Sequence, residues 1–305
     1  MKRIAATLLT AVAASILLFL LFELSPRSVA IATLGPFATP EQQTLWLQAH
    51  GYMQPPQVRY CRWLGHFLIG DFGQSRAFAA PVSSVLWPRL GHSLILVACF
   101  FAITLPVALP LGIAAGLREG SAVDRIVSAI AVATSALPPF ASAVLLSALL
   151  VTRLHLVPGT SIMTEGWDWR QVVLPVLVLV LSDVGYLARI TRTSMAEIMA
   201  TPYIRAAILK GMSPARILFR HALRNAMITP FTIIMLQVNW AIGGVVVVEA
   251  FYSFHGIGTL LLQAALRKDL PLLEAATFVL VMIAGITQML ADIGYAFLNP
   301  RIRLS

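Results

Sequence analysis

The sequence predicts an all-α integral membrane protein with six transmembrane helices, a folded polar loop, and a small subdomain outside the membrane. Three observations support this fold class. Of the 305 residues, 58% are hydrophobic and only 11% are charged, against roughly 25% charged residues in soluble domains. The apolar residues form long runs, and the basic residues gather between those runs.

Each of six apolar runs is long enough to cross a bilayer, for which a helix needs about 20 residues. Lipid offers no partners for backbone N–H and C=O groups, so each run must be a helix or part of a closed barrel. The continuous hydrophobicity differs from the alternation over roughly ten residues that a barrel strand shows. The predicted spans are Ile4–Phe22, Leu94–Leu117, Ile126–Val151, Val172–Ala188, Phe231–Phe251 and Leu272–Phe297.

Five prolines fall in or beside these spans, where we expect kinks whose freed carbonyl groups find partners on neighbouring helices. They are Pro106, Pro110, Pro138, Pro139 and Pro175.

Basic residues predict the orientation of the spans. Lys2 and Arg3 place the N-terminus in the cytoplasm, and six crossings return the C-terminus to the same side. The cytoplasmic segments (1–3, 118–125, 189–229 and 298–305) then hold 13 Lys and Arg residues in 60 positions. The opposite segments (23–90, 152–171 and 253–270) hold 9 in 106, a bias that follows the positive-inside rule.

The chain divides into an N-terminal transmembrane helix at 1–23, an extracytoplasmic subdomain at 24–90, and a five-helix core at 91–305 with a cytoplasmic loop at 191–229. Ser28-Val29-Ala30 resembles a signal-peptide cleavage site, so removal of the first span is an alternative. That span is longer than the roughly 7–15 apolar residues of such a segment. Cys61 and Cys99 have no CxxC or metal-ligand partner.

Amphipathic stretches at Glu41–His50 and Gln57–Leu68, together with Trp46, Trp63 and Trp87, predict that the outer segment folds. The alternative interpretation is that the tryptophans only anchor the chain at the membrane interface.

The loop at 191–230 predicts a basic pair of helices. Seven of the 22 basic residues lie in it or at its edge, against one acid, Glu197. The first helix should run from Met195 to Leu209, with Pro202 marking either a kink or a new start. Gly211 suits the left-handed position that ends a helix. Ser213 can cap the second helix, Pro214–Met227, with Pro214 at its first position.

Two other interpretations of this loop exist. A basic interfacial helix could lie on anionic lipid, and some of the arginines are expected to do so. A DNA-binding helix–turn–helix would have a similar turn, but two flanking membrane spans argue against nucleic acid as a partner.

At these residues the chain resembles the permease subunits of binding-protein-dependent ABC importers, and more narrowly their dipeptide/oligopeptide/nickel branch. The family's Glu-Ala-Ala, three residues, then Gly corresponds to Arg205-Ala206-Ala207 and Gly211, with Arg205 in place of the Glu and Pro202 where the branch has Asp. Further matching motifs are Gly70–Ser75, Gly243–Gly258 and Asn299–Leu304.

The resemblance implies a type I ABC importer fold in which the loop docks on an ATPase. It implies as partners a second homologous permease, two cytoplasmic ATPase subunits and an extracytoplasmic substrate-binding protein that docks on the outer subdomain. The implied coupling residues are Tyr203, Arg205, Ala206, Ala207, Lys210, Gly211, Ser213 and Arg216.

Other polar residues limit the chemistry of the chain itself. It has no GxxxxGK[ST] phosphate loop and no Ser–His–Asp or HExxH pattern, so we expect no enzyme here and no cofactor, with ATP and Mg on the partners. Intramembrane carboxylates mark pathways or tight polar contacts. Asp183, Gln237 and Asn239 are therefore candidates for the translocation pathway, with interhelical hydrogen bonding as the alternative.

The sequence thus predicts one half of the pore of an ATP-driven importer for peptides or peptide-like solutes. Nickel, opine or oligosaccharide-type solutes are alternative substrates. A secondary transporter that uses Asp183 and Glu249 to carry protons is a rival from another class, and a membrane-embedded hydrolase is a third.

Overall fold

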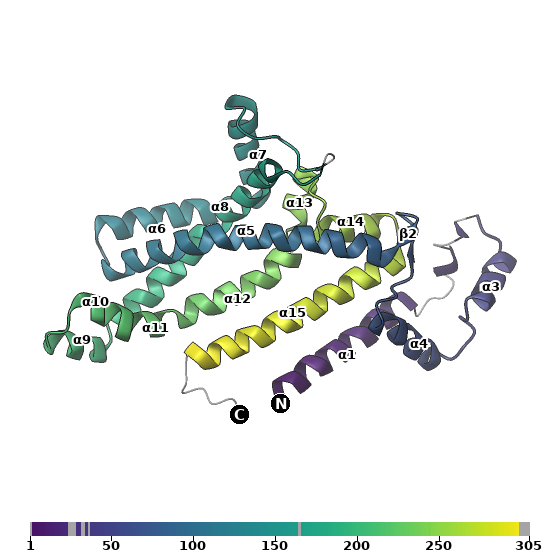
Figure 1. Ribbon diagram of the computed structural model, residues 1–305, viewed down its shortest axis with the longest axis horizontal. Helices are drawn as coiled ribbons and strands as arrows, with labels where there is room; N and C mark the ends of the chain where they lie inside the picture. Colours follow the sequence, from purple (N-terminus) through teal and green to yellow (C-terminus); the bar gives the residue numbers. More distant parts are fainter. Residues whose placement is uncertain are drawn as a thin grey trace. The chain divides into compact units, whose positions relative to one another are not determined.

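In the computed structural model, residues 2–23, 29–31, 34–35, 37–163, 166–243 and 245–298 are described, and helices dominate them (Figure 1). Contacts group the chain into two compact units. The first consists of 1–92 and 256–289, and the second of 93–255 and 290–305. The division of the chain at 1–23, 24–90 and 91–305, which was expected from the order of the spans, remains a prediction. Ser28, Gly244 and the motif at Asn299–Leu304 lie outside the described residues.

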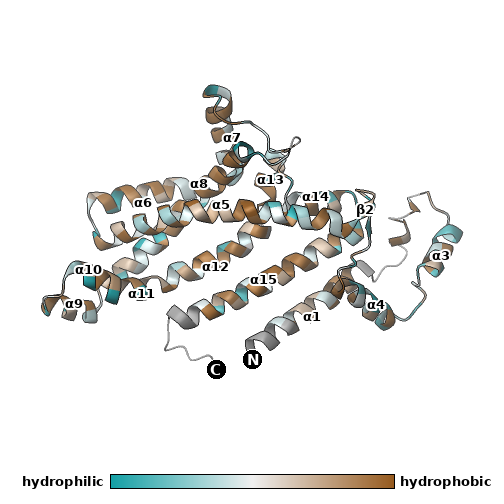
Figure 2. Cartoon of the chain, viewed as in Figure 1, coloured by the Kyte–Doolittle hydropathy of each residue, from teal (hydrophilic) through white to brown (hydrophobic). Residues whose placement is uncertain are grey.

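Three of the described helices are long and apolar enough to cross a membrane: α5 (Val82–Leu117), α8 (Trp169–Met199) and α15 (Leu270–Leu298). The N-terminal helix α1 covers Lys2–Glu23. Figure 2 shows apolar residues along α5, α12 and α15. Pro175 lies inside α8 without breaking it. Among the described residues, bent helix pairs bring the number of candidate spans to as many as six.

The predicted span Ile126–Val151 is broken rather than kinked. Helix α6 (Ala122–Ser135) ends before Pro138, and α7 (Pro139–Ser147) continues into a π-helix, η1 (Ala148–Arg153), at an angle of 97° to α6. Two adjacent prolines explain the break, because both lack a backbone N–H and the residue before a proline avoids helical geometry. Pro138 itself is extended, with φ −61° and ψ 146°.

The predicted span Phe231–Phe251 also consists of two helices, α12 (Ile228–Gly243) and α13 (Val246–Tyr252). A left-handed residue, Ser253, ends α13 at φ 56°. Helix α14 (Ile257–Leu266) follows in the chain.

In the first unit, α3 (Pro40–Ala49) and α4 (Pro56–Leu68) match the two amphipathic stretches of the sequence. A short antiparallel hairpin follows, formed by β1 (Gln74–Ser75) and β2 (Ala80–Pro81). Asp269 holds it, since one carboxylate oxygen accepts from Ser75 Oγ at 2.6 Å and from the Ala77 N–H at 2.9 Å. Helix α5 begins directly afterwards at Val82, earlier than the predicted Leu94. The core of this unit is Phe67, Phe72, Val82, Leu86, Leu90, Ile257, Leu260, Ala264, Leu272, Ala275, Ala276 and Val279.

In the second unit, glycines let α8 approach its neighbours closely. A Cβ on Gly112 of α5 would lie 2.5 Å from the carbonyl oxygen of Ala188, and one on Gly185 of α8 would lie 2.7 Å from the Cα of Ala131 on α6. Small residues at such crossings are typical of helix packing in membranes. Helix α8 therefore packs closely on two sides.

Candidate functional site

The basic loop begins with a helix break at Pro202. Helix α8 continues past the membrane run to Met199, and a separate helix, α9 (Pro202–Leu209), starts with Thr201 at the N-cap position. Pro202 occupies the first turn, where a missing N–H costs nothing. The single helix predicted from Met195 to Leu209 is thus two elements, and the new start is the correct alternative at Pro202.

Gly211 forms the turn that ends α9. Its φ is +72°, its N–H donates to the Ile208 carbonyl at 2.9 Å, and the Met212 N–H donates to the Ala207 carbonyl at 3.3 Å. These two bonds make a Schellman motif, in which a left-handed glycine satisfies the last free carbonyls of a helix. The predicted left-handed position is confirmed.

The second helix of the loop is less regular than predicted. It consists of α10 (Pro214–Arg216), a π-helix η2 (Ile217–Ala222) and α11 (Leu223–Ala226). Ser213 stands at the N-cap position before Pro214, but its side chain makes no capping hydrogen bond, which corrects the predicted cap. Wide π turns often occur at functional sites.

The two loop helices pack on α8 rather than projecting freely. Six buried side chains form their core: Met195, Ile204, Ala207, Ile217, Ala222 and Ala226. At the edge of this core, Asn225 Nδ2 donates to the Tyr203 hydroxyl oxygen at 3.0 Å. A buried hydrogen bond of 2.7 Å from Ser194 Oγ to the Ala226 carbonyl fastens α11 to α8. The loop is a folded element fixed to a membrane helix.

Most of the predicted contact residues lie on the outer face of this element. Ala207 is the exception, because it is buried in the core. The exposed ones are Tyr203, Arg205, Ala206, Lys210, Gly211, Ser213 and Arg216.

Two large apolar residues outside the predicted set of contact residues are also strongly exposed. Leu209 is 82% exposed and Phe219 is 71% exposed. Phe219 lies within the π-helix η2, between the buried residues Ile217 and Ala222. The signal available for Leu209 was its place at the last helical position, two residues before the glycine that forms the turn. Exposed apolar side chains among basic ones are typical of a protein contact.

Arg192 binds inside the protein instead of facing a partner. Its Nε and Nη2 donate to the two carboxylate oxygens of Asp124 at 2.8 and 2.7 Å, and Nη2 also lies 3.3 Å from Glu119 Oε1. This bidentate pair joins α8 to the start of α6, before the apolar run that begins at Ile126. The Arg192 guanidinium and the Gly120 N–H hold the pKa of Asp124 well below its usual value.

Two of the predicted pathway residues meet in a cavity. Gln237 on α12 donates through Nε2 to a carboxylate oxygen of Asp183 on α8, and both side chains are buried. The cavity has a volume of about 450 Å³ and lies against the break between α6 and α7. The side chain of Asn239, the third predicted residue, lies outside the described part of the chain.

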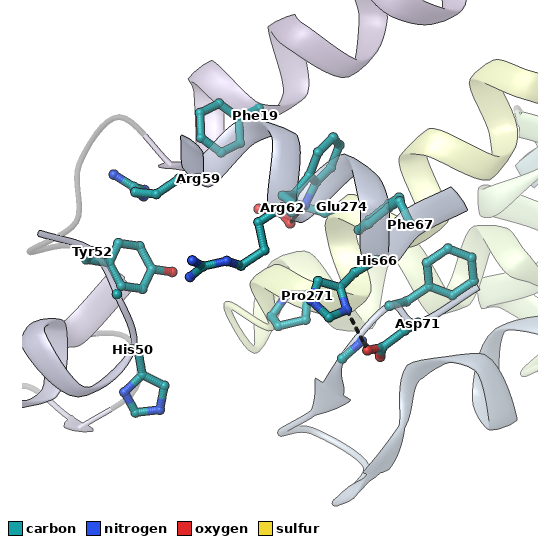
Figure 3. Close-up of a pocket in the computed structure, with 14 residues that line it drawn as sticks. Phe19, His50, Tyr52, Arg59, Arg62, His66, Phe67, Asp71, Pro271 and Glu274 are labelled. Atoms are coloured by element: carbon teal, nitrogen blue, oxygen red, sulfur yellow. Dashed lines mark hydrogen bonds and ion pairs between the residues drawn. The ribbon is translucent and has the colours of Figure 1, made fainter. Parts of the chain in front are cut away.

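A second cavity, of about 380 Å³, lies in the first unit beside α4 and the start of α15. Figure 3 shows Arg62 pointing toward Tyr52 across this space, with the ion pair of His66 and Asp71 at its rim. The Gly73 N–H and His66, 3.0 Å away, lower the pKa of Asp71. Aromatic rings and charged side chains of both signs line this second cavity. Such a lining is suited to contact with a polar surface of another protein.

Other intramembrane acids have structural partners. Ser93 Oγ donates to Glu249 at 2.7 Å, and Trp63 Nε1 donates to Glu274 at 3.0 Å. Within the described ranges, no group of three or more His, Cys, Asp or Glu residues is arranged to hold a metal ion.

The long apolar helices define a multi-pass membrane protein with a folded polar loop. Residues 108–304 match the family described as binding-protein-dependent transport system inner membrane component, and the chain belongs to this family.

Several curated proteins are similar to the chain over nearly its whole length. A putative peptide transport system permease protein of Brucella abortus is 34% identical over 99% of this chain and 98% of its own length. The oligopeptide transport system permease protein AppB of Bacillus subtilis is 30% identical over 94% of this chain and 93% of its own. A probable peptide ABC transporter permease protein of Sinorhizobium fredii is 30% identical over 99% and 98%.

Proposed function

We propose that this chain is one of two pore-forming subunits of an ATP-driven importer for peptides or peptide-like solutes, and that its basic loop couples the pore to separate ATPase subunits. The family membership and the names of the similar proteins support the transport class and the peptide-type solute. Nickel, opine or oligosaccharide-type solutes are the alternative substrates.

The loop carries the coupling role in this proposal. Its helices have their own core and a buried bond to α8, so a push on the loop moves α8 as well. Its outer face offers Arg205, Lys210 and Arg216 beside Leu209 and Phe219. That mixture of cationic and apolar side chains fits a groove on a soluble partner better than it fits the lipid surface alone.

Helix α8 links the loop to the membrane cavity. It runs unbroken from Trp169 to Met199 and carries both Asp183 and Ser194. A packed helix transmits a displacement along its axis because its backbone is stiff and its neighbours are close-packed. Closure of the ATPase subunits on ATP and Mg would thereby move the walls of the cavity, and the chain itself would be no enzyme.

The partners in this assembly are a second homologous permease, two cytoplasmic ATPase subunits, an extracytoplasmic substrate-binding protein and membrane lipid, without nucleic acid. Both termini and the loop then lie in the cytoplasm. The outer helices α3 and α4 and the cavity of Figure 3 would face the binding protein.

Uptake by the reconstituted transporter tests the proposal. Liposomes that contain this chain with its partner permease and ATPases should accumulate trialanine only when the binding protein and ATP are present. A proton ionophore should leave the rate unchanged. Uptake by this chain alone, driven by a proton gradient, would support the rival in which Asp183 and Glu249 carry protons.

A further inference from the structure

Two buried oxygen atoms in the wall of the cavity between α8 and α12 have no hydrogen-bond partner among the described residues. They are Oδ2 of Asp183 and Oε1 of Gln237, and the two side chains are only 8% and 7% exposed. The other oxygen of Asp183 accepts the Gln237 amide N–H. The pair is therefore ordered internally but presents two unsatisfied acceptors.

Both unsatisfied atoms need a hydrogen-bond donor. A buried acceptor left without one costs about 1–3 kcal/mol, and more when it is charged, while an uncompensated buried carboxylate is costlier still. A ligand that donates N–H groups would supply a hydrogen bond to both oxygen atoms at once. An anion would instead add another acceptor without a donor.

The lining of the cavity favours a cation. None of its described lining residues is Lys, Arg or His, whereas Tyr186 and Trp240 are among them. Aromatic faces attract cations, and tryptophan does so best. The end of α6 and the start of α7 at Pro139 both border the cavity, and their partial charges have opposite signs. Because these two partial charges oppose each other, the carboxyl group of Asp183 decides that the cavity prefers a cation to an anion.

We propose that this cavity is a subsite for a primary ammonium group, such as the amino terminus or a lysine side chain of a solute in transit. The three N–H groups of an ammonium supply a donor for Asp183 and a donor for Gln237, and one remains for water or backbone. The volume of about 450 Å³ also holds the chain that bears the group. The assignment to a solute in transit rests on the proposed function, whereas the preference for ammonium does not.

Charge-selective labelling measures the preference directly. Ser182 also lines the cavity, and its hydroxyl donates to the Val178 carbonyl of its own helix. Ser182→Cys in a chain carrying Cys61→Ser and Cys99→Ser, within the complete transporter, is labelled with ethylammonium and ethylsulfonate methanethiosulfonates. The result is the ratio of the two rates, each normalised to a free thiol in solution.

The ammonium reagent should react faster, and Asp183→Asn should lower the rate ratio by at least about tenfold, because one unit charge at close range is worth more than about 1.4 kcal/mol. Asp183→Glu should keep the ratio. Leu45→Cys on α3, which is 65% exposed in the segment assigned outside the membrane, is the control and should show no dependence on Asp183. If the Ser182→Cys ratio is the same with and without the Asp183→Asn substitution, the proposal is overturned.

A second variant covers a failure of Asp183→Asn to assemble. Gln237→Lys places an ammonium group against Asp183 and should lower the ratio, because it cancels the charge of the carboxylate, and an unchanged ratio would again contradict the proposal. Transport is measured in parallel with trialanine at saturating binding protein, where Asp183→Asn should lower the maximal rate and Asp183→Glu should retain most of it. An unchanged rate alongside a lowered ratio would contradict the transit role.

These outcomes separate the two proposals. No ATP-dependent uptake by the wild-type transporter would contradict the proposed function and leave the labelling ratio as evidence for an ammonium site. If uptake is normal and the ratio of labelling rates is the same with Asp183 and with Asp183→Asn, only the ammonium site is contradicted.

Discussion

Ser194 Oγ donates a buried hydrogen bond of 2.7 Å to the carbonyl oxygen of Ala226, and Pro230 explains why that oxygen is free. In a continuous helix the carbonyl of residue 226 would accept the N–H of residue 230. Proline has no N–H, so Ser194 of α8 supplies the donor instead. The loop is thus fastened to α8 at the point where its own helical bonding is interrupted.

Ser194→Ala should destabilise the packing of the loop on α8. The substitution leaves the Ala226 carbonyl buried without a donor, which costs about 1–3 kcal/mol. We expect a lower thermal midpoint for the purified transporter and a weaker response of uptake to ATP. Ser182→Ala on the same helix is the matched control, because the Val178 carbonyl that it bonds keeps its helical N–H partner. Equal midpoints for the two variants would argue against the fastening role.

Gly211→Val should disrupt the turn that ends α9. A β-branched residue held at φ +72° costs roughly 1–2 kcal/mol, although open space surrounds the site. We expect membrane insertion to be retained, while co-purification of the ATPase subunits and uptake are lost. Gly211→Asn, which tolerates a left-handed backbone, should retain both. If Gly211→Val transports normally, the turn has no part in coupling.

The pair formed by Arg192 and Asp124 should stabilise the fold in a pH-dependent way. The folded-state pKa of Asp124 is lowered by its bonds to Arg192 and Gly120. Its contribution is therefore complete above the unfolded pKa of about 3.9 and is lost as the pH falls below that value. The difference in thermal midpoint between wild type and Asp124→Asn should be largest near neutral pH and shrink below about pH 4.

Arg192→Lys gives a further check on the geometry of this pair. Lysine keeps the charge but cannot form the bidentate contact with the carboxylate. Its midpoint should lie between those of wild type and Asp124→Asn. A midpoint for Arg192→Lys equal to that of wild type would show that charge alone matters.

Membrane spans, the turn at Gly211 and the loop position could be predicted because each depends on local chemistry. Long apolar runs must form helices in lipid, and a glycine suits the left-handed turn whatever surrounds it. The break at Pro138–Pro139 could be predicted only as a kink, because the size of a bend depends on what packs against it. The π-helix η2, which contains Phe219, could not be predicted from the sequence, because no residue pattern is specific for a π-helix.

Contacts between distant segments were the least predictable part of the candidate site. Arg192 counts among the basic residues of the loop, yet its partners are Asp124 and Glu119 on another element. The pairing of Asp183 with Gln237 joins two spans whose register the sequence leaves open. Ala207 matches the family motif but is buried, so its place in the pattern reflects packing of the loop rather than contact.

Site-specific photocrosslinking at Leu209 tests the coupling role most directly. A benzoylphenylalanine at this position, 82% exposed at the end of α9, should crosslink to an ATPase subunit in the assembled transporter. The same group at Leu266, which is 76% exposed at the end of α14, should give no ATPase crosslink. A transport-competent Leu209 variant that fails to crosslink to the ATPase would contradict the account.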